Sequence, residues 1–229
     1  MDGRCKSGMA PPLAVDIDGT LSRPDRSIDP RVIDALGAWP APVVIATGKA
    51  LPFPVALAQF SGLEPMVVAE NGGIAAAPET IQVHGDRTAA DAVVTEYRNQ
   101  GYDLGFGNPD LANKWRETEI AVSRDSPLEP LEAIAAEHGL EVIDSEYAYH
   151  VKSPTVSKGA AFESLAAHLG FDPGAALAVG DSPNDVSLFE VADTGVAVAN
   201  ATEDAKAAAD LVTSGSYADG FLEALNTVL

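Results

Sequence analysis

Residues 13–21 have the sequence LAVDIDGTL, in which a short apolar run leads into two carboxylates separated by one residue. The apolar residues predict a buried strand, and the acidic residues and glycine that follow predict where it ends. Because alternate side chains of a strand point to the same side, Asp16 and Asp18 are expected to share one small site. Buried like charges repel each other and lose hydration unless a cation or a hydrogen-bonded ligand compensates them. Taken alone, this stretch predicts either an oxygen site for Mg²⁺ or a solvated turn.

Three further segments carry polar groups of the same kind. The sequence GDSPND follows an apolar run and contributes Asp181 and Asp185. Thr47 and Gly48 follow the apolar run VVIA and offer a hydroxyl and backbone amides, which can hold an anion. Lys158 opens a predicted helix, where its ammonium can offset carboxylates or a phosphate. Open α/β sheets bind ligands at the carboxyl ends of their strands, so these groups are expected to converge.

Each of these residues has a simpler interpretation when it is taken alone. Thr47 can be a cap at the end of a strand, and Lys158 can be a surface residue in the first turn of a helix. Asn184 is either a turn residue that orients Asp185 or a group that contacts the ligand. The presence of all four polar segments in one chain favours the functional interpretation of Thr47 and Lys158, and both interpretations of Asn184 stay open.

Apolar runs alternate with helical periodicities along the chain, which is typical of an α/β fold with a parallel sheet. In the first part of the sequence, strands and helices are predicted in turn at 13–17, 29–38, 43–46, 52–60 and 66–69. The same alternation returns toward the C-terminus, where helices are predicted at 158–169 and 185–191 and strands at 176–179 and 195–198.

A segment of different character separates these two parts. Its predicted elements are, in order, a helix at 88–99, a strand at 117–122, a second helix at 127–138 and a hairpin of two strands at 140–145 and 147–152. This order predicts a small α+β unit at about residues 82–152, inserted into a core made of residues 11–81 and 153–229. Residues 1–10 are predicted to be a disordered leader, and either Met1 or Met9 can be the start.

The composition is strongly acidic, with 34 Asp plus Glu against 14 Lys plus Arg and a formal net charge of −20. This charge argues against binding to nucleic acid and to anionic membranes. Hydrophobic residues make up 46% of the chain, which predicts a folded protein rather than a disordered one. A dense carboxylate surface stays hydrated in molar salt, so the balance indicates a halophilic protein. The alternative is an ordinary acidic mesophilic protein.

Cysteine content and hydropathy bear on location. The single residue Cys5 forms no internal disulfide and indicates no oxidising compartment. No apolar run reaches the roughly 18 residues that a membrane span needs, and the first residues lack the apolar stretch of a signal peptide. A cytoplasmic protein is therefore expected, with a homodimer as the common default for its assembly.

The four polar segments together resemble the ordered motifs of the haloacid dehalogenase-like phosphatases. They are DIDGTL at 16–21, Thr47, SKG at 157–159 and GDSPND at 180–185. The resemblance covers the core and implies a Rossmann-like parallel sheet. An insert between the second and third motifs resembles the family's type-two cap, an α+β lid over the active site. The runs ATGKALPF and AENGG are similar in particular to archaeal phosphoglycolate phosphatases, which tend to have Asn or Arg where Lys49 stands.

The resemblance implies a role for each motif residue. Asp16 is implied as the nucleophile that forms an aspartyl phosphate, and Asp18 as the proton shuttle. Mg²⁺ is implied as the cofactor, held by Asp16, Asp181 and Asp185 and lying near the backbone carbonyl of Asp18. The residues implied to bind the phosphorylated substrate are Thr47, Gly48, Lys158 and Asn184.

The implied reaction is hydrolysis of a small phosphomonoester, most specifically of 2-phosphoglycolate to glycolate and phosphate. A sugar-phosphate phosphatase, a phosphotransferase or mutase, and a non-catalytic phosphate-binding protein are the alternatives. Within the insert, Asn113, Arg116 and His150 are candidates for binding a substrate carboxylate, since an arginine matches that group with two parallel hydrogen bonds.

Overall fold

The computed structural model describes residues 10–145 and 147–228, so the predicted leader at 1–10 lies almost entirely outside the described residues. Its strands form two sheets. Those of the larger sheet are β1 (Leu13–Val15), β2 (Val43–Ala46), β3 (Val67–Ala69), β4 (Ile74–Ala77), β5 (Thr80–Val83), β9 (Leu177–Gly180), β10 (Thr194–Ala197) and β11 (Leu211–Val212). Their spatial order is β11-β10-β9-β1-β2-β3-β4-β5, which places the first strand of the chain in the interior of the sheet.

Strand β1 pairs in parallel with β2 on one side and with β9 on the other, and the strands from β11 to β3 are all parallel. Every residue of β1, β2, β3 and β9 is buried, so both faces of the sheet are covered there. This burial explains why these strands are continuous apolar runs rather than alternating ones. The predicted α/β fold with a mainly parallel sheet is confirmed.

The sheet continues beyond β3 as an antiparallel hairpin of β4 and β5, which the sequence analysis does not predict. The buried strand β4 has the sequence IAAA, and alanine is depleted in strands, so local propensity gives no signal here. Residues 82 and 83, which the sequence analysis assigns to the insert, complete strand β5 of the large sheet.

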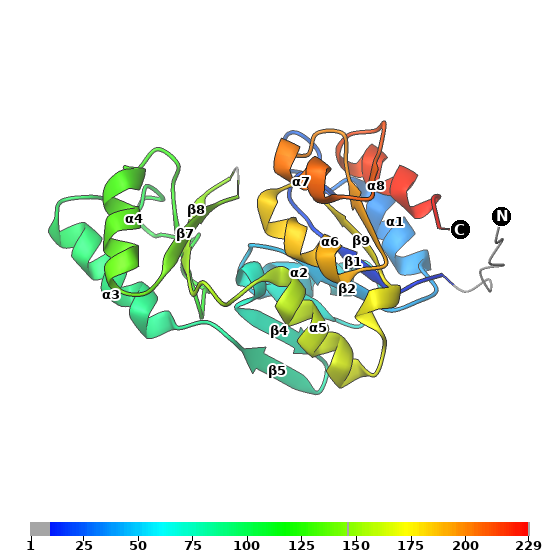
Figure 1. Cartoon of the computed structure of the whole chain (residues 1–229), viewed down its shortest axis with the longest axis horizontal. Coiled ribbons are helices and arrows are strands. Elements are labelled where there is room, and N and C mark those ends of the chain that lie inside the picture. Colours follow the sequence, from blue (N-terminus) through cyan, green and yellow to red (C-terminus); the bar gives the residue numbers. More distant parts are fainter. Residues whose placement is uncertain (1–9, 146, 229) are drawn as a thin grey trace.

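Helices cover the large sheet, with α5 packed against α6 and α1 packed against α8 (Figure 1). Asp29 caps the first helix by accepting a hydrogen bond from the Arg31 amide, and Ser157 caps α5 by accepting one from the Ala160 amide. The helix α8 is absent from the sequence-based prediction. The helices of this part are α1 (Pro30–Ala38), α2 (Pro52–Phe60), α5 (Lys158–Leu169), α6 (Val186–Val191), α7 (Glu203–Ala208) and α8 (Tyr217–Leu225), with short 3₁₀ turns η1 (Glu70–Gly72), η2 (Pro173–Ala175) and η3 (Pro183–Asp185).

The segment between β5 and α5 forms a separate three-stranded antiparallel sheet, at the other end of the molecule in Figure 1. The predicted hairpin is present as the β7–β8 pair. Two helices pack on this sheet around an apolar cluster of their own, which includes Tyr97 and Leu131. The elements are α3 (Arg87–Asn99), β6 (Ile120–Val122), α4 (Leu128–Glu137), β7 (Glu141–Asp144) and β8 (Tyr149–Lys152), and we call residues 84–157 the insert.

Residues 117–119 were predicted to begin a strand, but the strand starts only at Ile120. The amides of Glu117 and Thr118 instead donate hydrogen bonds to the buried carboxylate of Glu70, which follows β3 of the large sheet. The prediction was wrong here because this partner lies far away in sequence. Among the helices described, none has the length and hydropathy to cross a membrane.

Candidate active site

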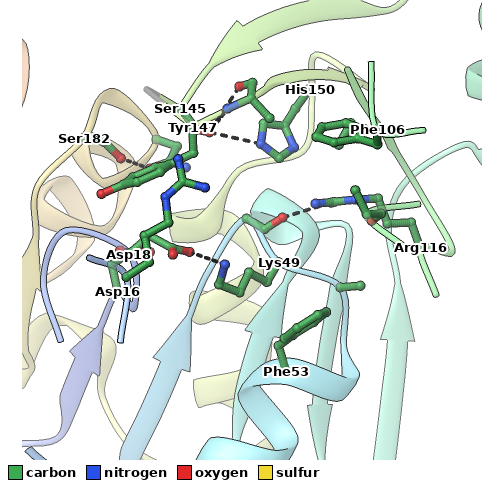
Figure 2. A pocket seen from close by; sticks show the side chains of 17 residues that line it. Asp16, Asp18, Lys49, Phe53, Phe106, Arg116, Ser145, Tyr147, His150 and Ser182 are labelled. Carbon is green, nitrogen blue, oxygen red and sulfur yellow. Dashed lines mark hydrogen bonds and ion pairs between the residues drawn. The ribbon is translucent and has the colours of Figure 1, made fainter. Parts of the chain in front are cut away.

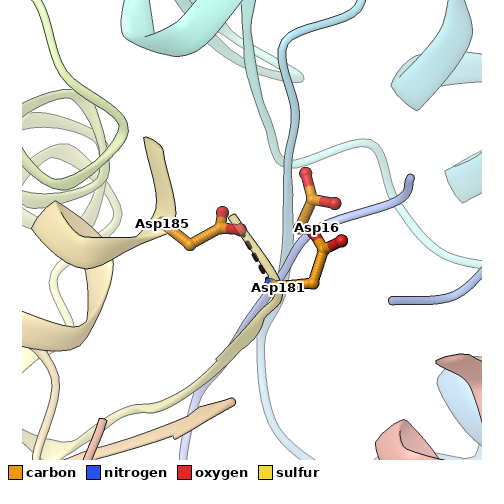
Figure 3. A group of neighbouring side chains, drawn as sticks. All are labelled: Asp16, Asp181 and Asp185. Carbon is orange, nitrogen blue, oxygen red and sulfur yellow. Dashed lines mark hydrogen bonds between the residues drawn. The ribbon is translucent and has the colours of Figure 1, made fainter. Parts of the chain in front are cut away.

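Three carboxylates meet where β1 and β9 end (Figure 3). Asp16 follows β1, Asp181 follows β9, and Asp185 ends the turn η3. All three are buried, and each offers an oxygen that lies within 4.8 Å of the oxygens offered by the other two. The parallel pairing of β1 with β9 brings together two motifs that are far apart in the sequence. The predicted convergence of these three residues is therefore present in the structure.

Lys158, at the start of α5, lies among these carboxylates with its side chain fully buried. Its Nζ is 2.7 Å from Oδ1 of Asp16 and 2.7 Å from Oδ1 of Asp185. Burial alone would lower the pKa of Lys158, but the two carboxylates raise it above its ordinary value, so the side chain is an ammonium. Three carboxylates and one ammonium leave two negative charges, which is the charge that a divalent cation neutralises.

The carboxylates also fit a divalent cation in their hydrogen bonding. Oδ1 of Asp181 is sealed from solvent and has no hydrogen-bond partner among the described residues. Burial raises the pKa of Asp181 and of Asp16, and the charge of Asp185 raises both further, while Lys158 acts in the opposite direction. A carboxylate whose pKa is raised in this way needs a compensating positive charge to stay ionised. Oxygen ligands of this kind suit Mg²⁺, which commonly binds through one or two carboxylates and waters.

Gly19 leaves the space that Asp181 occupies. Its φ is +81°, a left-handed conformation that glycine adopts at little cost. A Cβ atom at this position would lie 1.8 Å from Oδ2 of Asp181. The glycine of the DIDGTL motif is therefore required because the carboxylate of Asp181 lies so close to it.

The side chain of Asp18 lies apart from the carboxylate cluster. It forms an ion pair of 2.9 Å with Lys49, which follows β2. The predicted contact of Asp18 with the metal would therefore have to come from its backbone carbonyl, and that contact stays a prediction. Thr47 is buried just after β2, where its Oγ1 accepts a hydrogen bond from the Lys49 amide. It does not line the cavity described below, so its contact with a phosphoryl group stays a prediction.

Asn184 and Gly48 meet a residue that the sequence analysis does not single out. The amide of Asn184 donates a hydrogen bond of 2.8 Å to Oδ1 of Asn71, and its own Oδ1 accepts one from Ser182. A Cβ at Gly48 would lie 3.0 Å from the same Asn71 oxygen. Asn184 also lines the cavity described below, so its two interpretations are compatible.

A cavity of about 200 Å³ lies between the core carboxylates and the insert. In Figure 2, Asp16 and Asp18 lie toward one side of it, and Arg116 and His150 from the insert lie toward the other. The third candidate of the insert, Asn113, does not line this cavity. Its side chain instead bonds Asp110 and the backbone of Ala121 within the insert. The residues that line it include Asp16, Asp18, Arg26, Gly48, Lys49, Phe53, Phe106, Arg116, Ser145, Tyr147, His150, Ser182 and Asn184.

Sequence reasoning missed two contributors to this cavity. The guanidinium of Arg26 lies 4.8 Å from the ring centroid of Tyr147, which joins the loop after β1 to the insert. Glu119 lies behind the cavity wall, where its carboxylate contacts Arg116 and His150. Neither belongs to a motif, and the contacts of Arg26 with Tyr147 and of Glu119 with His150 join residues far apart in the sequence, so no local pattern signals them.

Comparison with known proteins agrees with this geometry. The sequence profile of haloacid dehalogenase-like hydrolases matches residues 13–98 and 129–225. The phosphoglycolate phosphatase of Natronomonas pharaonis is 57% identical over 221 residues, covering 95% of this chain and 97% of the relative. That of Haloarcula marismortui is 57% identical over 217 residues, covering 94% of this chain and 96% of the relative. The crystal structure of Thermoplasma acidophilum 0175 shares the fold, with a TM-score of 0.82 at 24% identity over 96% of this chain and 98% of that one. The chain belongs to the haloacid dehalogenase-like hydrolase family.

Proposed function

We propose that this protein is a magnesium-dependent phosphatase that hydrolyses 2-phosphoglycolate to glycolate and phosphate. The observation that carries the proposal is the two-sided cavity. Asp16, which contacts Lys158 behind it, and Asp18 line one side, and Arg116 and His150 line the other. A substrate with a phosphoryl group at one end and a carboxylate at the other matches this arrangement. The names of the two haloarchaeal relatives support the same substrate.

Asp16 is proposed as the nucleophile. Its carboxylate oxygen attacks phosphorus, and the bond from phosphorus to the glycolate oxygen breaks, which leaves an aspartyl phosphate. Asp18 donates a proton to the leaving oxygen and then accepts one from the water that attacks the phosphoenzyme. That attack releases phosphate and restores the carboxylate of Asp16. Lys49, 2.9 Å from Asp18, holds this carboxyl group in place.

The other polar residues are proposed to orient the phosphoryl group. Lys158 already contacts Asp16 at 2.7 Å, so its ammonium can hold the nucleophile and a phosphoryl oxygen in line. Thr47 donates its hydroxyl hydrogen, and the Gly48 amide lies beside it at the end of β2. Mg²⁺ would be held by Asp16, Asp181 and Asp185, where it would neutralise negative charge on the phosphoryl oxygens. The insert is proposed to be the cap that covers this site, and the cytoplasm is the proposed location.

The substrate is tested by phosphate release from 2-phosphoglycolate, glucose 6-phosphate and 3-phosphoglycerate, in molar KCl with Mg²⁺ and with Asp16→Asn as the blank. We expect kcat/KM for 2-phosphoglycolate to exceed the others by at least about a hundredfold, or about 2.7 kcal/mol of transition-state discrimination. Equal rates on all three would leave the reaction class in place and contradict the substrate. No release above the blank would favour a phosphotransferase, tested with sugar acceptors, or a non-catalytic phosphate-binding protein.

Salt is expected to increase the activity. A protein with a formal charge of −20 repels a phosphomonoester anion, and this long-range repulsion falls as the Debye length shortens from about 10 Å at 0.1 M to about 3 Å at 1 M salt. The value of kcat/KM should therefore rise several-fold between 0.1 and 2 M KCl. Circular dichroism at each concentration separates this effect from a change in folding. A steady fall in kcat/KM of the folded protein would contradict the halophilic interpretation.

A further inference from the structure

Glu119 is a buried carboxylate of the insert that no motif accounts for. Its side chain is 1% exposed and precedes strand β6. Oε1 of Glu119 forms an ion pair with Arg116 and lies 2.8 Å from Nδ1 of His150. Oε2 accepts a hydrogen bond of 2.9 Å from the amide of Asn71. Three donors thus converge on one carboxylate, which does not itself line the cavity.

Both insert residues that Glu119 holds line the cavity. Nε and Nη1 of Arg116 donate to the carbonyls of Ala112 and Gly48. The remaining amino group, Nη2, has no hydrogen-bond partner in the part of the chain that the structure describes. Because Arg116 lines the cavity, this amino group is the part of the guanidinium that is left to bind a ligand there. His150 lines the same cavity, with its Nε2 at 3.1 Å from Oγ of Ser145.

Glu119 also connects this pair to the opposite side of the site. Asn71, which donates to Glu119, accepts a hydrogen bond of 2.8 Å from Asn184, and Asn184 is the neighbour of Asp185. Asn71 is held in a left-handed conformation with φ of +56°. The chain of contacts therefore fixes the separation between Arg116 and His150 of the insert and the loop that carries two of the clustered carboxylates.

We propose that Glu119 is a positioning residue that fixes Arg116 and His150 as the receptor for the substrate's carboxylate and, through Asn71 and Asn184, sets their distance from the phosphoryl site. This inference rests on the proposed function, because it assumes a substrate with a carboxylate. Glu119 acts through Arg116 and His150 rather than by contact with the substrate.

The electrostatic environment of Glu119 agrees with this role. Burial alone would raise the pKa of Glu119, but His150 and Arg116 hold it below its ordinary value, so the carboxylate stays ionised. An ionised carboxylate only accepts hydrogen bonds, which suits the three donors that face it. A glutamine of nearly the same shape has a single acceptor oxygen. Its NH₂ group would face at least one of the three donors, so the arrangement could not persist.

The test compares two substrates of similar size, 2-phosphoglycolate and ethyl phosphate, in which a methyl group replaces the carboxylate. The ratio of their kcat/KM values measures recognition of the carboxylate. In Glu119→Gln we expect this ratio to fall at least about tenfold, mainly through a higher KM for 2-phosphoglycolate, since charge-assisted hydrogen bonds are lost. The matched control is Glu117→Gln, which removes the same charge from an exposed side chain two residues away and should keep the wild-type ratio.

Each outcome decides between alternatives. If Glu119→Gln leaves the ratio of the two kcat/KM values unchanged, the inference is overturned. Unchanged kcat/KM values for both substrates would then mean that Glu119 has no role, and an equal loss for both would mean that its role is purely structural. A wild-type enzyme that shows no preference for 2-phosphoglycolate overturns the proposed function itself, and the carboxylate receptor with it. If Glu119→Gln does not fold, Glu119→Asp serves as the second variant. This variant keeps the negative charge but moves it by the length of one methylene group. If Glu119 acts by positioning, the ratio of the two kcat/KM values should fall at least about threefold. If only its charge matters, the ratio should equal that of the wild type.

Discussion

Replacement of Asp16 by asparagine is expected to lower phosphate release from 2-phosphoglycolate by at least about 10⁴-fold, because the amide cannot form the acyl phosphate. The substitution keeps the size of the side chain and removes one of three clustered carboxylates. Lys158 keeps its 2.7 Å contact with Asp185, so the buried ammonium remains paired. The measurement is the initial rate of phosphate release in KCl and Mg²⁺.

The melting temperature of Asp16→Asn is the control for folding. Because the neighbouring carboxylates repel Asp16 in the absence of a cation, the variant should melt no lower than the wild type in chelator. A folded variant that retains more than about a hundredth of the wild-type rate would assign the nucleophile to another group. Asp34→Asn is the matched exposed variant, since Asp34 lies on the outer face of α1, and it should keep the wild-type rate.

Removal of divalent cations is expected to lower the rate of phosphate release almost as much as the Asp16→Asn substitution does. Without a cation, Asp16, Asp181 and Asp185 retain uncompensated negative charge that opposes the phosphoryl oxygens. Dialysis against EDTA in molar KCl should reduce the rate by at least about 10³-fold, and added Mg²⁺ should restore it. The high KCl keeps the acidic surface screened, so that the loss reports on the site.

The same cation should raise the melting temperature, since a ligand that binds only the folded state stabilises it. Asp181→Asn removes the carboxylate with the unpartnered oxygen, and in that variant the Mg²⁺-dependent increase should disappear. Full activity after chelation, or an equal thermal shift in wild type and Asp181→Asn, would contradict a metal site at these three residues.

The sequence predicted the parts of the site that lie at the ends of buried strands. Asp16 and Asp181 follow apolar runs, and parallel pairing of two such runs is enough to bring the residues after them together. Lys158 could be placed because it opens the helix predicted at 158–169, whose periodicity is a local signal. The positions of these residues could be predicted because each signal depends on neighbours in the sequence, whereas their roles stay predictions.

The parts that could not be predicted depend on contacts between distant segments. The carboxylate of Glu70 replaces the strand expected at residue 117, although these residues lie 47 positions apart. The role of Arg26 depends on its contact with Tyr147, and that of Glu119 on its contacts with Asn71 and His150, which are distant in the sequence. Strand β4 was missed for a different reason, since an alanine-rich run has no preference for a strand and is held there by its burial and its pairing with β3 and β5.

The interior position of β1 in the large sheet bears on how the protein is made. On the ribosome β1 emerges well before β9, and at ordinary translation rates of about 5–20 residues per second the delay is on the order of ten seconds. The insert is one continuous stretch of chain with an apolar cluster of its own, so its internal contacts can form before β9 emerges. The nascent chain therefore carries β1 with one unpaired edge, and Asp16 meets Asp181 and Asp185 only after the last quarter of the polypeptide has begun to emerge.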